Sequence, residues 1–96
     1  ISDKNRQIDP KAILVQNYPN PFNPTTTIEF DLPMPEKVSL KIFTLRGEEV
    51  ANLLSGELSA GPHKVIWNAS RNANGVYFYV LQAGSYREVR KAILIK

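Results

Sequence analysis

The sequence predicts an all-β fold, an immunoglobulin-like antiparallel β-sandwich of about seven strands. Apolar and polar residues alternate over several short segments, and turn-forming residues recur about every ten positions. No segment shows an apolar period of 3.6 residues, so no amphipathic helix is expected. The 96 residues, 43% of them hydrophobic, fit one compact domain.

Residues 1–11 are polar and carry no periodic pattern, so we expect a linker or a remnant of an upstream region. The chain begins with Ile1 and not Met, which indicates a processed chain or an excised piece, and no signal peptide is identified. The sandwich is expected to span residues 12–96. The short apolar run at residues 12–16 is typical of an edge strand.

A proline-rich segment follows at residues 17–24 and reads Asn-Tyr-Pro-Asn-Pro-Phe-Asn-Pro. Pro19, Pro21 and Pro24 each fix their own φ angle and favour an extended conformation of the preceding residue. Neither a helix nor a sheet ladder is therefore expected. We predict an ordered extended loop whose Tyr18 and Phe22 pack onto the body of the domain.

Two segments then alternate strictly, at residues 27–32 and 37–42, with the prolines of residues 33–35 between them. Their alternation predicts two strands with these inward side chains: Ile28, Phe30, Leu32, Val38, Leu40 and Ile42. Residues 46–48 indicate a turn, in which Gly47 can adopt a positive φ angle. Residues 49–54 predict a weaker fourth strand, and the interrupted alternation at Val50 and Leu53 indicates a bulge.

Three further strands are expected, separated by turns at residues 59–62, 72–75 and 83–85. Residues 63–67 place Val65 and Trp67 toward the core. Residues 76–81 are apolar on both faces, as in a central strand, and residues 86–95 form the last strand.

The segment Gly75-Val-Tyr77-Phe-Tyr79 adds a topological indication. In immunoglobulin-like sandwiches, a tyrosine near the start of the sixth strand bonds back to the preceding corner. We expect Tyr77 to do so, and the alternative is that it is simply a core aromatic. Tyr79 would fill the inward position that cysteine takes in antibodies, with Trp67 as a core aromatic on a neighbouring strand.

Composition excludes several chemistries. The absence of Cys excludes disulfides, thiolate nucleophiles and Cys-based zinc sites, and the single histidine, His63, excludes multi-His metal sites. A Ser-His-Asp triad is not expected, because His63 begins a strand and no Gly-x-Ser-x-Gly motif is present. Glu29 and Asp31 share a strand face that points to solvent, so they are not expected to act as a catalytic pair.

Binding functions leave weaker signals. The net charge is only +3, and Arg87, Arg90, Lys91 and Lys96 are expected on the solvated face of the last strand, so no nucleic-acid site is predicted. Calcium ligands would have to come from Asp3, Asp9 and Asp31 without a recognisable loop motif. A carbohydrate platform would use Tyr18, Phe43, Tyr79 and Tyr86. Asn68-Ala-Ser70 matches a glycosylation acceptor pattern.

A series of segments carries a resemblance to a known family. It runs from Asn17-Tyr-Pro-Asn-Pro-Phe-Asn-Pro-Thr-Thr through residues 27–33, 38–43, 47–50, 58–63, 65–67, 75–79 and 90–96. Over residues 13–96 the chain resembles the type A C-terminal sorting domain of the type IX (Por) secretion system of Bacteroidetes and their relatives. It also resembles the immunoglobulin-like domain of flagellar-hook-capping proteins.

The resemblance implies a monomeric, non-enzymatic domain without a cofactor. Such a domain ends a larger exported protein and is recognised by the secretion machinery after the passenger reaches the periplasm. In some members a sortase-like peptidase cuts ahead of the domain and attaches the passenger to the cell surface. The alternative is a carbohydrate-binding or structural accessory module of a secreted glycoside hydrolase.

By the family's pattern, Gly75 and Tyr77 match a glycine–tyrosine element, for which an architectural role is the favoured interpretation. The terminal motif falls on Lys91, Ile93, Leu94, Ile95 and Lys96, where recognition and packing remain equally open. The proline segment with Trp67 is expected to be structural.

Overall fold

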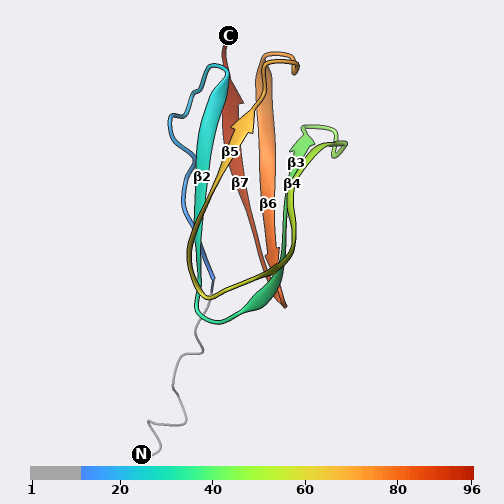
Figure 1. Cartoon of the computed structure of the whole chain (residues 1–96). Coiled ribbons are helices and arrows are strands. Elements are labelled where there is room, and N and C mark those ends of the chain that lie inside the picture. Colours follow the sequence, from blue (N-terminus) through green and yellow to red (C-terminus); the bar gives the residue numbers. More distant parts are fainter. Residues whose placement is uncertain (1–11) are drawn as a thin grey trace, which may run out of the picture.

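The computed structural model describes residues 12–96, which form two sheets packed face to face (Figure 1). The expected linker, residues 1–11, lies outside the described residues. The strands are β1 (Ile13–Leu14), β2 (Thr25–Leu32), β3 (Glu36–Thr44), β4 (Glu49–Leu58), β5 (Gly61–Asn68), β6 (Gly75–Ala83) and β7 (Tyr86–Leu94).

One sheet has the order β1-β2-β5 and the other β4-β3-β6-β7, and every neighbouring pair of strands is antiparallel. The chain crosses from one sheet to the other between β2 and β3, between β4 and β5, and between β5 and β6. This arrangement is compatible with the immunoglobulin-like sandwich and confirms the predicted fold class. β6 lies between β3 and β7, as its two apolar faces predicted.

The core lies between the sheets and is built by the alternation of each strand. The inward side chains predicted for the second and third strands are all at most 2% exposed. Trp67 and Tyr79 are also buried, at 3% and 0% exposed, as expected for core aromatics. The buried core thus consists mainly of residues that already recur at every second position in the sequence.

β4 carries the predicted irregularity. Its pairing with β3 shifts register between Leu40 and Lys41 and again between Ile42 and Phe43, which leaves Leu53 and Val50 without direct partners. The strand continues to Leu58, four residues further than predicted. Residues 55–57 are Ser-Gly-Glu, a composition that is typical of a loop. They occur here within a strand that has a neighbouring strand on one side only.

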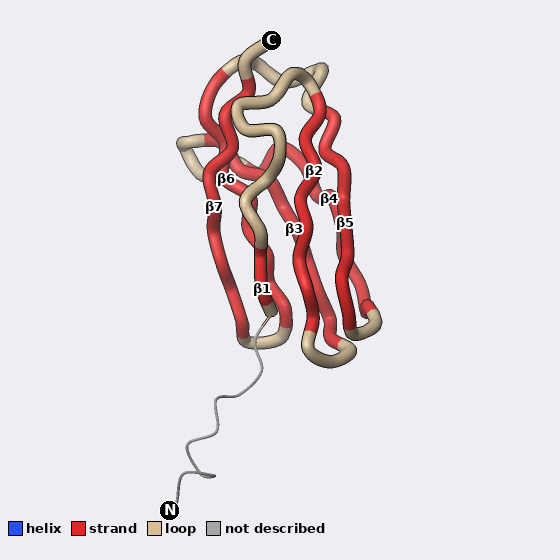
Figure 2. Tube along the Cα trace, turned by 90° about the vertical axis from the view of Figure 1, so that its left-hand side faces the viewer, coloured by secondary structure: helices blue, strands red, loops and turns tan. Residues whose placement is uncertain are grey.

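The proline-rich loop runs from the β1 side of the sandwich to its upper end, between β2 and β7 (Figure 2). Phe22 is 2% exposed and anchors the loop, as predicted. Tyr18 does not pack in the core: its side chain is 40% exposed, because its backbone bridges Thr27 and its hydroxyl reaches Glu29 on the outer surface. No helix among the described residues has the length and apolar character needed to cross a membrane.

Candidate recognition site

Gly75 and Tyr77 form the corner that leads into β6. The Tyr77 hydroxyl donates a hydrogen bond to the Ala73 carbonyl oxygen at 2.5 Å, which confirms the predicted tyrosine corner. Gly75 has a φ angle of 150°, which a residue with a Cβ rarely adopts, while no atom lies within 4 Å of the position a Cβ would take. Glycine is therefore required here by the backbone and not by crowding.

Three aromatic rings connect this corner to the proline-rich loop. The ring centroids of Phe22 and Trp67 lie 5.2 Å apart, and those of Trp67 and Tyr77 lie 5.4 Å apart at an edge-on angle of 79°. Edge-to-face aromatic pairs are favourable beyond the area they bury. Trp67 of β5 therefore joins the loop to β6 across the sandwich.

The terminal motif pairs directly with the glycine–tyrosine element. Leu94 is the partner of Gly75, and Ala92 is the partner of Tyr77. The two groups of residues that the resemblance selected, 14 positions or more apart in the chain, thus meet in one ladder at the upper end of the molecule.

The side chains of the terminal motif divide between two faces. Leu94 is fully buried, so its side chain packs in the core and is closed to a partner of the folded domain. Lys91, Ile95 and Lys96 are exposed, with Ile95 at 55%, and Ile93 is half-buried. In the folded domain, a partner can reach only the outward side chains of the terminal motif.

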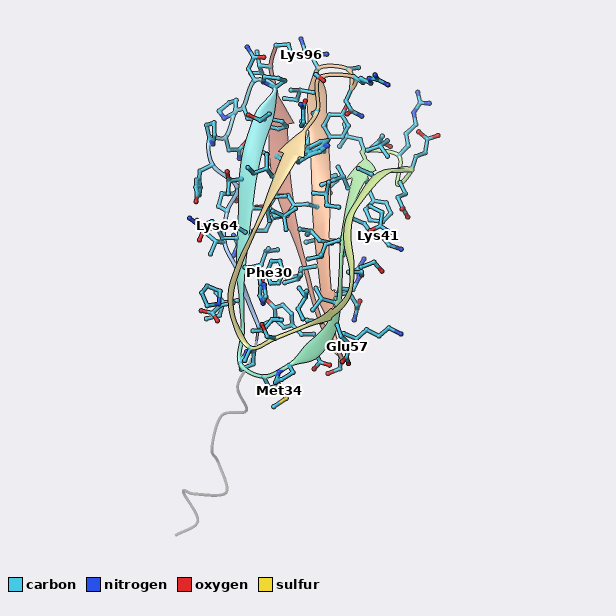
Figure 3. The ribbon with its side chains drawn as sticks, viewed as in Figure 1. Phe30, Met34, Lys41, Glu57, Lys64 and Lys96 are labelled. Carbon is cyan, nitrogen blue, oxygen red and sulfur yellow. The ribbon has the colours of Figure 1, made fainter. Side chains whose placement is uncertain are left out.

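The end of the chain is fastened to the corner. The Lys96 backbone N–H donates to Asn74 Oδ1 at 2.9 Å, and Lys96 Nζ donates to the Ser70 carbonyl oxygen at 3.1 Å. Figure 3 shows Lys96 at the upper end of the molecule, opposite Met34 at the lower end. The side-chain ammonium group of Lys96 consequently has a defined position.

The proline-rich loop closes the outer edge of the terminal motif. The Phe22 N–H donates to the Ile93 carbonyl oxygen at 2.9 Å, and the Ile95 N–H donates to the Phe22 carbonyl oxygen at 3.0 Å. Asn20 Oδ1 accepts from the Ile93 N–H at 2.9 Å, and Gln16 Nε2 donates to the Lys91 carbonyl oxygen at 2.9 Å. These backbone groups of the terminal motif are therefore occupied by the loop and by Gln16.

The loop is held by its own polar groups as well. The Pro19 carbonyl oxygen accepts from Thr26 Oγ1 at 2.9 Å, and the Pro24 carbonyl oxygen accepts from the Ala69 N–H at 2.8 Å. Asn17, which is buried, donates from Nδ2 to Thr26 Oγ1 at 2.9 Å. These contacts support the structural role expected for the prolines.

Asn17, Asn20 and Gln16 are the site residues that sequence reasoning missed. Asn20 and Gln16 contact β7 across more than 70 positions of the chain, and no periodic pattern links such pairs. The available signal was local: Gln16 and Asn17 precede the loop prolines and Asn20 lies between two of them, and prolines lack the backbone donors that such polar side chains can replace.

A hollow of about 400 Å³ lies beside the corner. It is lined by Thr44, Leu45, Arg46, Glu48 and residues 73–77, which include Gly75 and Tyr77. Leu45 is 68% exposed at this hollow, so an apolar side chain and charged groups stand next to each other there. The hollow lies on the same end of the molecule as the terminal motif, because Gly75 pairs with Leu94.

The four basic residues that were predicted to share one face of the last strand do not all lie on that face. Arg87, Lys91 and Lys96 are exposed, but Arg90 does not share their face. Strand geometry turns it to the other side of β7, where its Nη2 lies 2.9 Å from Glu88 Oε2 and its Nε is buried without a partner among the described residues. The sequence prediction of one solvated basic face was wrong for Arg90.

The proposed carbohydrate-binding aromatics do not form one platform. Tyr79 is fully buried, and Tyr86 packs against the core. Phe43 alternates outward from Ile42 on the four-stranded sheet, whereas Tyr18 lies on the other sheet beside Thr27. These rings face different directions, so the expected four-residue surface is not assembled.

The remaining candidate chemistries gain no partners within residues 12–96. The His63 ring stacks on Phe30, with centroids 5.2 Å apart, and its Nε2 lies 2.8 Å from the Ser59 carbonyl oxygen. Glu29 pairs with the Tyr18 hydroxyl on the outer surface. No group of three or more His, Asp or Glu side chains in this part of the chain is placed to hold a metal ion. Asp3 and Asp9 lie outside it.

These features define a small β-sandwich module whose C-terminal strand is fastened by backbone bonds and offers its outward side chains to solvent. A comparison with family profiles matches residues 16–96 to the secretion system C-terminal sorting domain, Por_Secre_tail. The chain belongs to this family, the C-terminal sorting domains of type IX secretion. A search among curated proteins found no match.

Proposed function

We propose that residues 12–96 are a non-catalytic sorting domain that follows an N-terminal passenger in a larger secreted protein. The type IX machinery recognises the folded domain in the periplasm and exports the passenger across the outer membrane to the cell surface. The observation that carries this proposal is the match of residues 16–96 to the sorting-domain family. The outward side chains of residues 91–96 support it, because they are the accessible part of a fixed terminal strand.

In this proposal Lys91, Ile95 and Lys96 make the recognition contacts, with Ile93 at their centre. Gly75 and Tyr77 position them: Gly75 pairs with Leu94, and the Tyr77 corner fixes the start of β6. Phe22 and Trp67 hold the proline-rich loop against the same strand. A sortase-like peptidase would cut the chain ahead of this domain and leave the terminal motif intact.

The test is an export assay in a host with a type IX system. A periplasmic reporter fused ahead of residues 12–96 is expected to reach the cell surface or the medium, whereas the reporter alone stays in the periplasm. Retention of a folded fusion in the periplasm would overturn the proposal. Folding of the fusion is checked by protease resistance of the sandwich in periplasmic extracts.

A further inference from the structure

The outer edge of β7, the side that faces away from β6, is covered by other segments in its upper half, from the Lys91 carbonyl oxygen onward. Its lower half, at Arg87 and Val89, has no neighbouring segment among the described residues. β7 pairs with β6 over nine residues without a register shift. On its other side, Gln16 and the proline-rich loop bond to the Lys91 carbonyl oxygen, and the loop bonds to the backbone of Ile93 and Ile95. Backbone groups of a strand alternate in direction, so Arg87 and Val89 point outward too.

Nothing within residues 12–96 bonds to those lower groups. No backbone contact joins Arg87 or Val89 to another segment on the outward side. The N–H and C=O groups of Arg87 and Val89, together with the N–H of Lys91, therefore form a short template for one more strand. An unpaired edge of this kind pairs readily with an extended segment of another chain.

The other two long edges suit a partner strand less well. β4 is interrupted by its two register shifts. β5 begins with Gly61 and Pro62, and its exposed Lys64 lies beside Glu29 on β2, where the two charges offset each other. Bulges, prolines and mixed charges all discourage strand addition, whereas the lower β7 edge has a regular ladder and no proline.

The side chains along this edge indicate the partner's chemistry. Arg87, Val89 and Lys91 are exposed on the outer face, in the order basic, apolar, basic. Their cross-strand neighbours on β6 are Gln82, Val80 and Phe78, so the outer face of these two strands carries no acidic residue. Neither Arg87 nor Lys91 forms an ion pair with an acidic side chain of the described residues.

The polar side chains on the inner face of the edge contact one another, and the one buried group left without a partner among the described residues is Arg90 Nε. The Tyr86 hydroxyl bonds to Glu88, and Glu88 pairs with Arg90. Selectivity for a partner therefore comes from the outer face. A second copy of this chain in antiparallel pairing would set Arg87 against Lys91, and like charges directly opposite are unfavourable.

We propose that the lower edge of β7, at Arg87–Lys91, binds an extended segment of the secretion receptor that carries an acidic, a β-branched and again an acidic side chain at every second position. The segment extends the four-stranded sheet by one strand, with its carboxylates beside Arg87 and Lys91 and its apolar side chain beside Val89. This inference rests on the proposed function for the identity of the partner. The edge itself is defined by the structure.

The binding test uses the full 96-residue chain and fluorescein-labelled peptides of sequence TETVTET and TKTVTKT, which place Glu or Lys on either side of a Val on one strand face, measured by fluorescence anisotropy. The acidic peptide is expected to bind at least tenfold more tightly than the basic one. Chemical-shift changes on binding are expected at Arg87, Val89 and Lys91 in NMR spectra. Equal affinities, or shifts confined to other strands, would overturn the inference.

Val89→Pro removes the central outward N–H without removing a bond to β6, so it is expected to lower affinity for the acidic peptide at least tenfold. Ile66→Pro is the matched control, because Ile66 lies on the outward edge of β5, and it is expected to change affinity less than twofold. Val89→Thr keeps the N–H and is expected to retain binding. Full affinity in a folded Val89→Pro variant would contradict strand addition.

An export arm separates this inference from the sorting role. A reporter fused to the Val89→Pro domain is expected to be exported at least tenfold less than the wild-type fusion, with Ile66→Pro unaffected. Normal export of the Val89→Pro fusion would overturn the inference and leave the proposed function intact. Failure of the wild-type fusion would instead contradict the proposed function.

Discussion

The hydroxyl of Tyr79 joins the start of the domain to its central strand. It accepts a hydrogen bond from the Asn17 N–H at 2.7 Å and donates one to the Val15 carbonyl oxygen at 3.1 Å. The ring itself is fully buried. One side chain thus fills the core and satisfies two backbone groups where β1 gives way to the proline-rich loop.

Replacing Tyr79 by Phe removes the hydrogen-bond partner of the buried Asn17 N–H and of the partly buried Val15 carbonyl oxygen. We expect Tyr79→Phe to lower the free energy of unfolding by about 1–3 kcal/mol. Tyr18→Phe is the matched control, since the Tyr18 hydroxyl is on the surface, and its effect is expected to stay within about 0.5 kcal/mol. Urea denaturation measures both, and equal effects would contradict the role assigned to Tyr79.

Tyr86 gives the domain a dependence on alkaline pH. Burial and then the hydrogen bond to the Glu88 carboxylate raise the pKa of Tyr86 from 10.0 to about 12. The folded state therefore holds this proton more tightly than the unfolded state between about pH 10 and pH 12. The contribution is complete below pH 10 and is lost as the pH rises toward 12.

We accordingly expect the free energy of unfolding to fall between pH 10 and pH 12, and to fall less steeply in Tyr86→Phe. Chemical denaturation at a series of pH values measures the slope. Tyr77→Phe serves as a comparison that removes a tyrosine hydroxyl elsewhere. An unchanged slope in Tyr86→Phe would contradict the assignment.

At the scale of elements, the proline-rich loop acts as a clamp on the end of β7. It contributes Asn20 and the Phe22 backbone to the outward groups of Ile93 and Ile95. Phe22 anchors it in the core beside Trp67. The clamp covers an edge that would otherwise be open over its whole length, which limits unspecific strand pairing.

Asn20→Ala removes the acceptor for the Ile93 N–H. We expect hydrogen exchange at this amide to accelerate about tenfold or more, because about 1.4 kcal/mol of local stability corresponds to a factor of ten. The Ile95 amide, bonded to the Phe22 carbonyl oxygen, is expected to keep its protection. Asn23→Ala is the control, since Asn23 is exposed in the same loop. Undisturbed exchange at Ile93 would show that Asn20 does not hold the strand.

The strands could be predicted because one face of each packs on a core. Ile28, Phe30 and Leu32 repeat at every second position, and β2 begins only two residues before the predicted start. The Tyr77 corner was also predictable, because its signal lies within a few residues. The extension of β4 to Leu58 was not, because its polar residues 55–57 have no core-facing repeat.

The sequence predicted which residues belong to the candidate site, but it did not predict how they are arranged in space. The resemblance selected Gly75, Tyr77 and the terminal motif, but only the register Gly75↔Leu94 places them together. Alternation alone implies that Leu94 and Ile95 face opposite ways, so they cannot share one role. The contact of Asn20 with Ile93 depends on the path of an irregular loop, which local sequence does not encode.

At the scale of the whole molecule, the two ends of the sandwich are distinct. The terminal motif, the corner and the hollow at residues 73–77 gather at the upper end, opposite Met34 (Figure 3). Lys41 and Lys64 lie on opposite sides of the sandwich in the same view. Basic side chains are thus distributed over the molecule. Lys91 lies on β7, and Lys96 follows the last residue of β7, Leu94, by two positions.

In the proposed function, the secretion machinery reads the outward side chains of the folded terminal strand. Deleting residues 91–96 does not isolate this claim, because it also removes the buried Ala92 and Leu94. The direct measurement is export of a reporter fused to the Lys91→Glu/Lys96→Glu domain, beside a Lys37→Glu/Lys64→Glu control, which makes the same change of charge at two exposed lysines outside the terminal motif. We predict that export falls at least tenfold for the first variant and stays within twofold of wild type for the control. Equal export of both variants, with both domains folded, would contradict the claim.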